Sequence, residues 1–535
     1  METTASLETQ QKTACREIIE QILNNKEKNE TLNKLKIRIC KKHQLNRVPS
    51  NSEILNYASE QEKPYLLPHL VKKKTRTISG IIIVAVMSKP APCPGTCIYC
   101  PGGNIAPKSY SGYEPAAMRA IQNKYDPYLQ VKARIKQLEA IGHRVDRGKV
   151  KLVIMGGTFL SLPIDYQHYF LKRCLEAITD TSANTLDEAK RNAEHSRIRN
   201  VGITFETRPD YCREIHVDSM LYMGGTKVEI GVQTVYDDIY KFVRRGHTVQ
   251  DVVEAFRIAK DSGLKITAHL MPNLPGSNYQ RDLEMFKTIF NDPRFKPDSL
   301  KIYPCLVLEG TPLYDLYLKR EYIPYSDNDV VKLVAEAKRI IPKWIRIQRI
   351  QRDIPSNLIV CGVKNGNLRE LAAEELAKRG YKCQCIRCRE IGHMLRRDPH
   401  ILEKEDIILH TEKYAASEGE EVFISYENRD RSILVGFLRL RKPSDLAHRP
   451  EIQNCSSMIV RELHVYGPLV PVNEKPKDEW QHRGYGKKLL SEAEKIAREE
   501  YDAKKLLVLS GIGVKEYYYR LGYQPDGVYV SKKLE

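Results

Sequence analysis

Three cysteines with the spacing C-x3-C-x2-C lie close together in the segment MSKPAPCPGTCIYCPGG. Thiolates at this spacing can hold three irons of a 4Fe–4S cube and leave the fourth iron without a protein ligand. That iron is free to chelate a cofactor and to pass it an electron. Zinc is the alternative metal, but it needs a fourth ligand, and neither His nor Cys occurs in the ten residues that follow. We therefore predict an iron–sulfur site at Cys93, Cys97 and Cys100.

A second set of cysteines, Cys383, Cys385 and Cys388, has the spacing C-x-C-x2-C in the segment KCQCIRCREIGH. Three thiolates can supply three of the four ligands of a zinc ion. The fourth ligand is either Cys305, in IYPCLVL, or His393. We favour Cys305, because it would join this segment to the preceding domain. Three free thiols are the alternative.

A glycine motif, Q-x-x-G-x-G, occurs at Gln481, Gly484 and Gly486 and opens the amphipathic stretch GKKLLSEAEKIA. Backbone N–H groups at the start of a helix favour a pyrophosphate, and glycine allows it to approach closely. The motif follows the strand-like segment SSMIVRELHVYGPLV and precedes KKLLVLSG. We expect a phosphate-bearing cofactor here; a glycine-containing helix cap in an unrelated domain is the alternative.

Six short apolar runs alternate with helical patterns in the first half of the chain. Such alternation predicts repeated βα units and a parallel sheet, with functional residues at the carboxyl ends of the strands. The C-terminal part is dominated by strands and has one strong helix near 484–500, which predicts a separate α+β domain. The runs span residues 80–87, 150–157, 201–206, 226–233, 264–271 and 299–304.

These patterns divide the chain into four parts. Residues 1–75 read as a basic helical segment, 76–380 as the βα unit, 381–397 as a Cys- and Arg-rich linker and 398–535 as the α+β domain.

The chain is strongly basic, with a net charge of +18 over 535 residues and a pI of about 9.1. A positive field of this size favours a polyanion such as RNA. One stretch between Thr31 and Ser52 contains no acidic residue, and we expect it to bind RNA. Its cations are Lys34, Lys36, Arg38, Lys41, Lys42 and Arg47.

No apolar run approaches the roughly 20 residues that span a bilayer, and the N-terminus lacks the apolar core of a signal peptide. We therefore expect a cytoplasmic protein with no membrane partner.

The first cysteine motif, placed directly after the first predicted strand, resembles that of the radical S-adenosylmethionine (AdoMet) superfamily. The resemblance implies a partial (βα)6 barrel, AdoMet bound to the open iron, an external electron donor and a 5′-deoxyadenosyl radical that abstracts hydrogen. The segment MGGT at 155–158 is similar to the superfamily's glycine-rich AdoMet contact. Candidate AdoMet or substrate contacts at the strand ends are Gly156, Gly157, Glu206, Arg208 and Gln233.

The C-terminal order of strand, glycine motif with helix, strand and short helix resembles the Gcn5-related N-acetyltransferase fold, whose splayed central strands hold the pantetheine arm of acetyl-CoA. The fusion of both domains, with segments such as IGVQTVYDDIYKFVRRGHT, QRDIPSNLIVCGVKNGNLREL and RELHVYGPLVP, is similar to the Elongator catalytic subunit family.

That resemblance implies a tRNA uridine-34 acetyltransferase. It would make 5-carboxymethyluridine from acetyl-CoA in the anticodon stem-loop. The chain looks like an archaeal or bacterial-type member that acts without the other Elongator subunits.

The same resemblance implies a set of acetyl-CoA contacts. A lysine before the second barrel strand, Lys149 here, belongs to it, although the inserted Arg147 and Gly148 put that assignment in doubt. Tyr518 is the implied catalytic tyrosine, and its neighbour Tyr517 is the second choice. The remaining implied contacts are Glu462, Leu463, His464, Val465, Tyr485, Gly486 and Lys487.

Two other functions stay open at this point. The chain could be a protein lysine acetyltransferase with the barrel as a scaffold, or an RNA-binding module that senses acetyl-CoA without turnover. The first cysteine motif argues against the lysine acetyltransferase, which has no use for an open iron–sulfur cluster.

Overall fold

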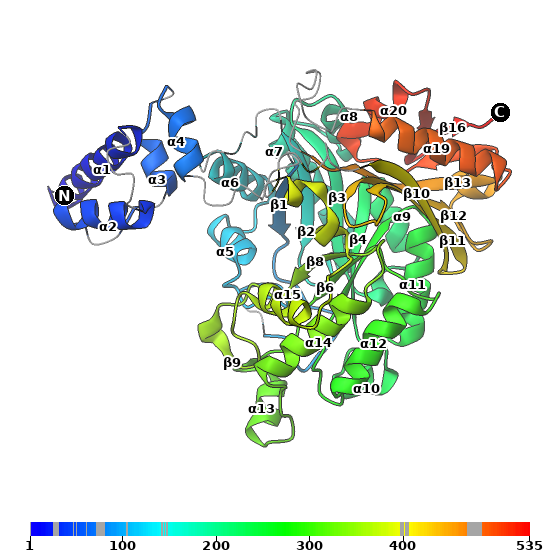
Figure 1. Ribbon diagram of the computed structural model, residues 1–535, viewed down its shortest axis with the longest axis horizontal. Coiled ribbons are helices and arrows are strands. Elements are labelled where there is room, and N and C mark those ends of the chain that lie inside the picture. The colour runs from blue at the N-terminus through cyan, green and yellow to red at the C-terminus, as the bar shows by residue number, and fades with distance from the viewer. Residues whose placement is uncertain are drawn as a thin grey trace.

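The computed structural model has three parts: a small helical unit, a partial barrel and a C-terminal mixed sheet (Figure 1). None of the helices it describes is long and apolar enough to cross a membrane. The structure describes residues 2–24, 31–45, 48–49, 51–59, 61–70, 81–102, 105–140, 143, 145, 148–395, 398, 401, 406–467 and 484–535.

The N-terminal unit packs four helices around a small apolar core that includes Ile18, Leu35 and Ile39. Its core is separate from that of the barrel, and Figure 1 shows the unit standing to one side. The helices are α1 (Glu2–Leu23), α2 (Leu32–Lys42), α3 (Asn51–Asn56) and α4 (Lys63–Leu70).

Most of the predicted basic stretch forms helix α2, but its cations do not share one exposed face. Lys36 is only 4% exposed, and its ammonium group donates to Asn51 Oδ1 at 2.9 Å. Lys42 pairs with Glu17. The prediction that Lys36 lies on an RNA-binding face is therefore wrong, because it fixes the start of α3 instead. Arg47 lies outside the described residues.

The barrel is a seven-stranded parallel sheet in the order β1-β2-β3-β4-β5-β6-β8. The six predicted strands are confirmed, and the seventh was missed. The strands are β1 (Ile81–Met87), β2 (Lys149–Met155), β3 (Arg199–Thr207), β4 (Gly225–Gln233), β5 (Lys265–Leu270), β6 (Ser299–Ile302) and β8 (Arg346–Ile350).

Side chains alternate between the two faces of this sheet, as a strand requires. In β2, Val150, Leu152 and Ile154 are fully buried against the outer helices. Lys151 and Val153 point the other way, into the barrel. The helices of this part are α5 (Pro115–Gln122), α6 (Pro127–Ala140), α7 (Ile164–Thr179), α8 (Leu186–Glu194), α9 (Glu214–Tyr222), α10 (Asp237–Phe242), α11 (Val249–Asp261), α12 (Tyr279–Asn291), α13 (Pro312–Leu318), α14 (Asp327–Ile340) and α15 (Leu368–Lys378).

Shorter elements complete the barrel part and its linker. They are β7 (Val307–Leu308), β9 (Ile359–Cys361), α16 (Ile386–Arg389) and α17 (Ile391–Met394).

The C-terminal domain is a second seven-stranded sheet, in which β13 and β14 are parallel and the other neighbours antiparallel. Strand β14 pairs with β13 only as far as Val460, so the rest of β13 has one edge without a partner strand in the described part of the chain. This is the splayed arrangement that the resemblance to the Gcn5-related N-acetyltransferase fold implies. The elements are β10 (Ile407–Ala416), β11 (Gly419–Asn428), β12 (Leu434–Lys442), α18 (Pro450–Gln453), β13 (Ser457–Val465), α19 (Tyr485–Glu499), β14 (Lys505–Val508), α20 (Lys515–Tyr519), β15 (Gln524–Asp526) and β16 (Tyr529–Lys533).

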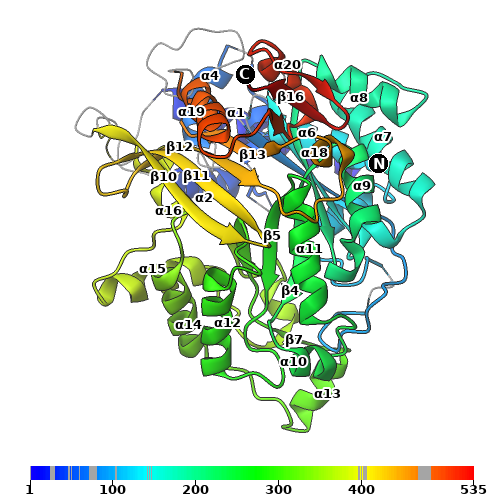
Figure 2. The same ribbon diagram turned by 90° about the vertical axis from the view of Figure 1, so that its right-hand side faces the viewer.

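The C-terminal sheet covers the amino-terminal ends of the barrel strands (Figure 2). Arg461 of β13 donates to the carbonyl of Leu264, just before β5, at 2.8 Å, and to Asp298, just before β6, at 2.6 Å. The loop after β14 lies against the start of β3, where Gly511 leaves no room for a Cβ beside Val201. The C-terminal domain therefore closes the end of the barrel opposite to the carboxyl ends of its strands.

Candidate active site

A cavity of about 850 Å³ runs through the inside of the partial barrel. Its wall includes Cys93, Cys97 and Cys100 at one end and Glu462 and His464 of β13 at the other. The seven residues of β2 set these ends roughly 20 Å apart, at about 3.3 Å per residue. One cavity thus reaches both predicted cofactor-binding regions.

The cysteine loop lies at the carboxyl end of the sheet, directly after β1. Arg245 donates from Nη1 to the sulfur of Cys97 at 3.4 Å, and Cys93 Sγ lies 3.9 Å from the hydroxyl of Thr158. A hydrogen bond from Cys100 and the positive charge of Arg245 lower the pKa of Cys97 below its usual value. Cys97 is therefore the cysteine of this loop that most readily forms a thiolate, which is the form that binds iron.

The geometry of this loop differs from that of a single-metal site. One zinc ion, with Zn–S distances of about 2.3 Å, draws its sulfurs to within roughly 4 Å of one another. Among the described residues, such a group forms at Cys383, Cys385 and Cys388, whose sulfurs lie within 4.8 Å of one another, and not at the first triplet. The three sulfurs of the first triplet are not all within 4.8 Å of one another, which suits a cube that takes each thiolate on a different iron.

Unpaired polar atoms surround the loop where AdoMet is predicted to bind. Ser88 Oγ, Arg208 Nη1 and Gln233 Oε1 are buried and have no hydrogen-bond partner among the residues that the structure describes. A buried polar atom is seldom left unpaired in a protein alone. These donors and acceptors fit the amino and carboxylate groups of AdoMet, so the residues present suit that cofactor.

The glycines of the MGGT segment leave space beside the same loop. A Cβ on Gly156 would stand 2.1 Å from Ser88 Oγ, and Gly157 takes a φ of +73°, which favours glycine. Gln233 ends β4 with a φ of +71°, an uncommon value for a side chain of this type. The structure thus brings Gly156, Gly157, Arg208 and Gln233 together around the cysteine loop.

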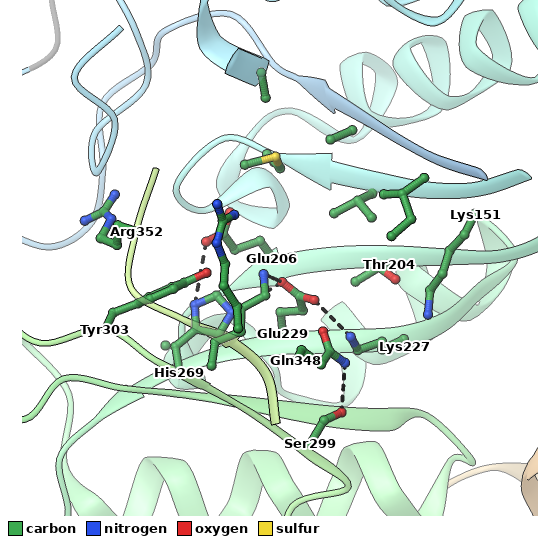
Figure 3. Close-up of a pocket in the computed structure, with 18 of the residues that line it drawn as sticks. Lys151, Thr204, Glu206, Lys227, Glu229, His269, Ser299, Tyr303, Gln348 and Arg352 are labelled. Atoms are coloured by element: carbon green, nitrogen blue, oxygen red, sulfur yellow. Dashed lines mark hydrogen bonds and ion pairs between the residues drawn. The ribbon is translucent and has the colours of Figure 1, made fainter. Parts of the chain in front are cut away.

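Charged side chains fill the middle of the cavity (Figure 3). Lys227 pairs with Glu229 at 2.9 Å, and Lys301 pairs with the same carboxylate. His269 lies 3.3 Å from Glu229 and 3.8 Å from Glu206, so it links the two acids. Glu206 also accepts the hydroxyl of Tyr110. The predicted residue Glu206 therefore belongs to an interior polar network, not to the cysteine loop.

Sequence reasoning missed most of this network, although a signal was present. Each of the segments KVKLVIM, TKVEIGV, LKITAHL and SLKIYP places a lysine in a largely apolar strand, and the second and third also contain Glu229 and His269. A charge within a buried strand of a parallel sheet marks a position that faces an interior cavity. Burial lowers the pKa of Lys151 and of Lys227 to about 8.

The amino end of the cavity is formed by one face of β13. Glu462 and His464 point into the cavity, while Leu463 and Val465 pack on the other face against the C-terminal core. Burial alone would raise the pKa of Glu462, but Lys265 and Arg439 outweigh it and lower the value to about 2. Burial lowers the pKa of His464 to about 4. At neutral pH this end holds a carboxylate beside a neutral imidazole.

Helix α19 begins beside the unpaired edge of β13. Gly484, with a φ of +83°, precedes Tyr485, whose ring meets Tyr426 edge-on at 4.8 Å. Lys487 is exposed at the helix start. Gln481 of the glycine motif lies outside the described residues.

The two candidate tyrosines lie differently. Tyr518 is 5% exposed and packs in the domain core against Tyr523. The hydroxyl of Tyr517 lies 2.9 Å from the position that a Cβ on Gly486 would occupy. Tyr517, the second choice from sequence, is therefore the tyrosine beside the helix start.

Lys149 opens strand β2 but is not part of the cavity wall, which Lys151 reaches two residues later. Burial lowers the pKa of Lys149. Lys149 therefore lies at the amino-terminal end of β2, outside the cavity wall, whereas Lys151 lines the cavity between its cysteine end and its β13 end.

The second triplet forms a compact three-sulfur site in the linker. The prediction that Cys305 supplies its fourth ligand is wrong. Cys305 is fully buried in the apolar cluster under the first cysteine loop, with Cys97 and Val307, and its thiol bonds to Tyr322. His393 is also outside the group and pairs with Glu390 at 2.8 Å.

We expect the purified protein to carry one zinc ion per chain on this triplet. Replacing Cys385, the buried member, with serine removes a thiolate ligand and should release the zinc while the iron content stays unchanged. Elemental analysis of both metals measures this, with Cys455→Ser in the C-terminal domain as the control. Equal zinc in the wild type and the Cys385→Ser variant would contradict the assignment.

Comparison with known proteins agrees with this architecture. Residues 91–289 match the radical SAM superfamily, 297–378 its C-terminal domain and 11–78 the ELP3 N-terminal domain. The chain is 50% identical to the tRNA uridine(34) acetyltransferase of Methanocaldococcus jannaschii, over 97% of each protein.

Two further relatives cover the same length. The chain is 45% identical to Elongator complex protein 3 of Schizosaccharomyces pombe, over 99% of this chain and 100% of that protein. The solved structure of archaeal Methanocaldococcus infernus Elp3 with an N-terminal deletion superposes with a TM-score of 0.76 at 44% identity, covering 86% of this chain and all of that one. The chain therefore belongs to the Elongator complex protein 3 (Elp3) family and carries a radical SAM domain.

Proposed function

We propose that this protein modifies uridine 34 of tRNA at carbon 5, using AdoMet radical chemistry and acetyl-CoA to make 5-carboxymethyluridine. The names of its relatives support the substrate and the acetyl donor. The observation that carries the proposal is the single cavity that joins the cysteine loop to the face of β13. A lysine acetyltransferase with a scaffold barrel would need no such connection.

The cofactors bind at opposite ends of the cavity, with the iron–sulfur cluster and AdoMet at the cysteine loop and acetyl-CoA at β13. When bound at Cys93, Cys97 and Cys100, a 4Fe–4S cluster with AdoMet supplies a radical that can abstract hydrogen from an unactivated methyl group. The pyrophosphate of acetyl-CoA is assigned to the start of α19, where Tyr485, Gly486 and Lys487 lie, and the pantetheine arm to the free edge of β13.

The residues of this chain then have separate tasks. Glu462, Leu463, His464 and Val465 border the acetyl arm, and Tyr517 closes the other side, with Tyr518 packed behind it. His464, neutral at pH 7, can accept a proton when water releases the product from CoA. The interior lysines direct ammonium donors toward the carbonyl oxygens of the acetyl group and the base. Lys149 remains a proposed contact from the family pattern.

The partners follow from this chemistry. The substrate is the anticodon stem-loop of tRNA, whose uridine must be splayed out to reach a buried cavity. An electron donor is required, and we propose that no other Elongator subunit is. A tRNA substrate implies a cytoplasmic location.

The deciding experiment is an anaerobic assay with reconstituted protein, AdoMet, a reductant, acetyl-CoA and transcribed tRNA, followed by mass spectrometry of the nucleosides. We expect 5′-deoxyadenosine and 5-carboxymethyluridine to form together, and no modified base in a control tRNA that carries cytidine at position 34. Acetylation of a lysine peptide without AdoMet would favour the lysine acetyltransferase instead. Binding of tRNA and acetyl-CoA without any product would favour the sensing module.

We also expect the N-terminal unit to contribute phosphate contacts through Lys34 and Lys41, which are exposed on α2 and have no ion-pair partner in the described part of the chain. Changing both to alanine should weaken tRNA binding uniformly and reduce the slope of log K against log salt by about 2. Filter binding over a salt series measures this. The control is Lys287→Ala with Arg294→Ala on the outside of the barrel, and an equal slope for both double variants would remove the assignment.

A further inference from the structure

Two lysines of the cavity wall have no acidic partner among the residues that the structure describes. They are Lys151 in β2 and Lys265 in β5. Lys151 makes no hydrogen bond or ion pair in that part of the chain (Figure 3), and the ammonium group of Lys265 donates to the carbonyl of Arg461 at 3.5 Å. A lysine carries three N–H donors, so both side chains have donors left for a ligand.

The acids that face the two lysines are already paired with other cations. Glu462, in β13, accepts a hydrogen bond from Arg439 at 3.0 Å. Glu229, in β4, pairs with both Lys227 and Lys301. The two lysines therefore add positive charge that these acids do not balance, and a charge inside a protein is costly unless it is paired.

The electrostatic surroundings of Lys151 agree with this count of charges. Burial and the positive charge of Lys265 lower the pKa of Lys151 to about 8. Glu462 and Glu229 act in the opposite direction but do not cancel the shift, and Arg346 in β8 adds to it. An anion bound beside the ammonium group would stabilise its charged form and raise its pKa again.

The two lysines lie beside the face of β13 to which the acetyl arm is assigned. Burial lowers the pKa of His464 to about 4, and the nearby charge of Lys151 contributes to this shift. Burial alone would raise the pKa of Glu462, and Lys265 is close enough to help to lower it to about 2. Any anion that forms next to His464 and Glu462 would therefore lie within the field of both lysines.

The proposed reaction forms one anion at this end of the cavity. Water adds its oxygen to the thioester carbon, and the C–S bond to CoA breaks. One proton of the water goes to the CoA sulfur and the other to His464, so a neutral thioester becomes the carboxylate of the carboxymethyl group. The uracil ring is uncharged, and the carboxylate of AdoMet is assigned to the opposite end of the cavity.

We propose that Lys151 and Lys265 form a carboxylate-binding site, which holds the carboxymethyl group of the product after water has released it from CoA. This inference rests on the proposed function, because only that reaction forms a carboxylate here. Hydrogen bonds from an ammonium group to a carboxylate are about twice as strong as those between neutral groups, and a low local dielectric strengthens them further. The enzyme therefore binds the modified tRNA more tightly than the unmodified one.

The test measures the affinity of the full-length protein, with CoA present, for three anticodon stem-loops that differ only at position 34. They carry uridine, 5-carboxymethyluridine or its neutral amide, 5-carbamoylmethyluridine. We expect the wild type at pH 7 to bind the acid at least tenfold more tightly than the amide, as measured by fluorescence anisotropy. Lys151→Met combined with Lys265→Met should bring the two affinities within twofold of each other.

The matched control is Lys172→Met, which removes a partly buried lysine of the barrel from outside the cavity wall. Its partner Glu176 keeps a second cation, Arg173, so the variant should retain the tenfold preference. A pH series gives a second readout, because the free protein loses the ammonium proton of Lys151 near pH 8. The preference should be constant from about pH 6 to 7 and decline above about pH 8, whereas an ordinary lysine would keep it to about pH 10.

Each other outcome has a definite meaning. Equal affinity of the wild type for the acid and the amide would overturn the proposal, and so would a preference that survives in the double variant. Equal weakening of all three stem-loops in that variant would also overturn it, because the lysines would then contact tRNA phosphates. If the double variant does not fold, Lys151→Gln repeats the test and should reduce the preference at least threefold. Failure of the wild type to bind any of the three stem-loops would instead overturn the proposed function.

Discussion

Replacing Cys97 with serine is expected to abolish both 5′-deoxyadenosine and 5-carboxymethyluridine. Cys97 is 8% exposed, and it is the cysteine whose sulfur accepts from Arg245. A serine hydroxyl does not ionise near neutral pH, so the variant loses one iron ligand and the charge that Arg245 stabilises. An incomplete thiolate set does not keep the cluster that the reaction needs.

The measurement combines iron and sulfide analysis, the visible spectrum of the cluster and quantification of both products. Cys361→Ser is the control, because Cys361 packs against the same apolar cluster as Cys97 but lies on β9, outside the loop. We expect tRNA affinity to be unchanged in both variants, which separates loss of chemistry from loss of folding. Modified uridine in the Cys97→Ser protein at the wild-type rate would falsify the radical assignment.

Much of the barrel could be predicted because most of its strands are recognisable as short apolar runs in the sequence. Runs such as IIIVAVM are apolar on both faces or interrupted only by an inward lysine, and each is followed by an amphipathic helix. Strand β8 escaped detection because RIQRI places Arg346 and Gln348 on the inner face, where they line the cavity. The inner face of a partial barrel lines a polar cavity, so the edge strand β8 has a polar sequence and lacks the apolar run that identifies the other strands.

The relation between the two domains could not be predicted. Parallel sheets place their sites at the carboxyl ends of the strands, and the cysteine loop follows that rule. The C-terminal domain instead docks at the amino ends, through Arg439, Arg441 and Arg461 on β12 and β13. These arginines read as solvent-facing strand positions, yet each is at most 1% exposed. Their carboxylate partners in the barrel, Asp261 and Asp298, lie more than a hundred residues earlier in the chain, and no local pattern encodes such a pairing.

The same limit explains the error at Cys305. Cys305 was chosen because it would join the linker to the barrel, but it follows a strand, and all strand ends of a barrel lie near one another, so the sequence could not tell which cysteine group it joins. Cys305 packs under the first cysteine loop, and the second triplet is left with three sulfurs. The prediction for Lys36 was wrong for a related reason, because a local count of charges does not show that α3 packs against α2, where Asn51 accepts the ammonium group of Lys36.

The largest effect on stability is expected from Asp298, which joins the two domains. It is 2% exposed and accepts from Arg461 at 2.6 and 3.0 Å and from the amide of Ile266 at 2.7 Å. Removing one partner of a buried ion pair leaves an uncompensated charge and costs ~3–5 kcal/mol. We therefore expect Asp298→Ala to lower the free energy of unfolding by that amount, whereas Glu284→Ala, in an exposed pair on α12, should change it by less than about 0.5 kcal/mol.

The pH dependence gives an independent check on the cause. Burial alone would raise the pKa of Asp298, but Arg461 and Arg439 outweigh it and hold the pKa below its ordinary value. A carboxyl whose folded pKa is depressed stabilises the fold above its unfolded pKa of about 3.9 and loses this contribution as pH falls further. The stability difference between the wild type and Asp298→Asn should therefore be constant from pH 5 to 7 and shrink below about pH 4. Urea denaturation across this range measures it, and a difference that persists unchanged at acid pH would show that packing, not charge, holds the domains together.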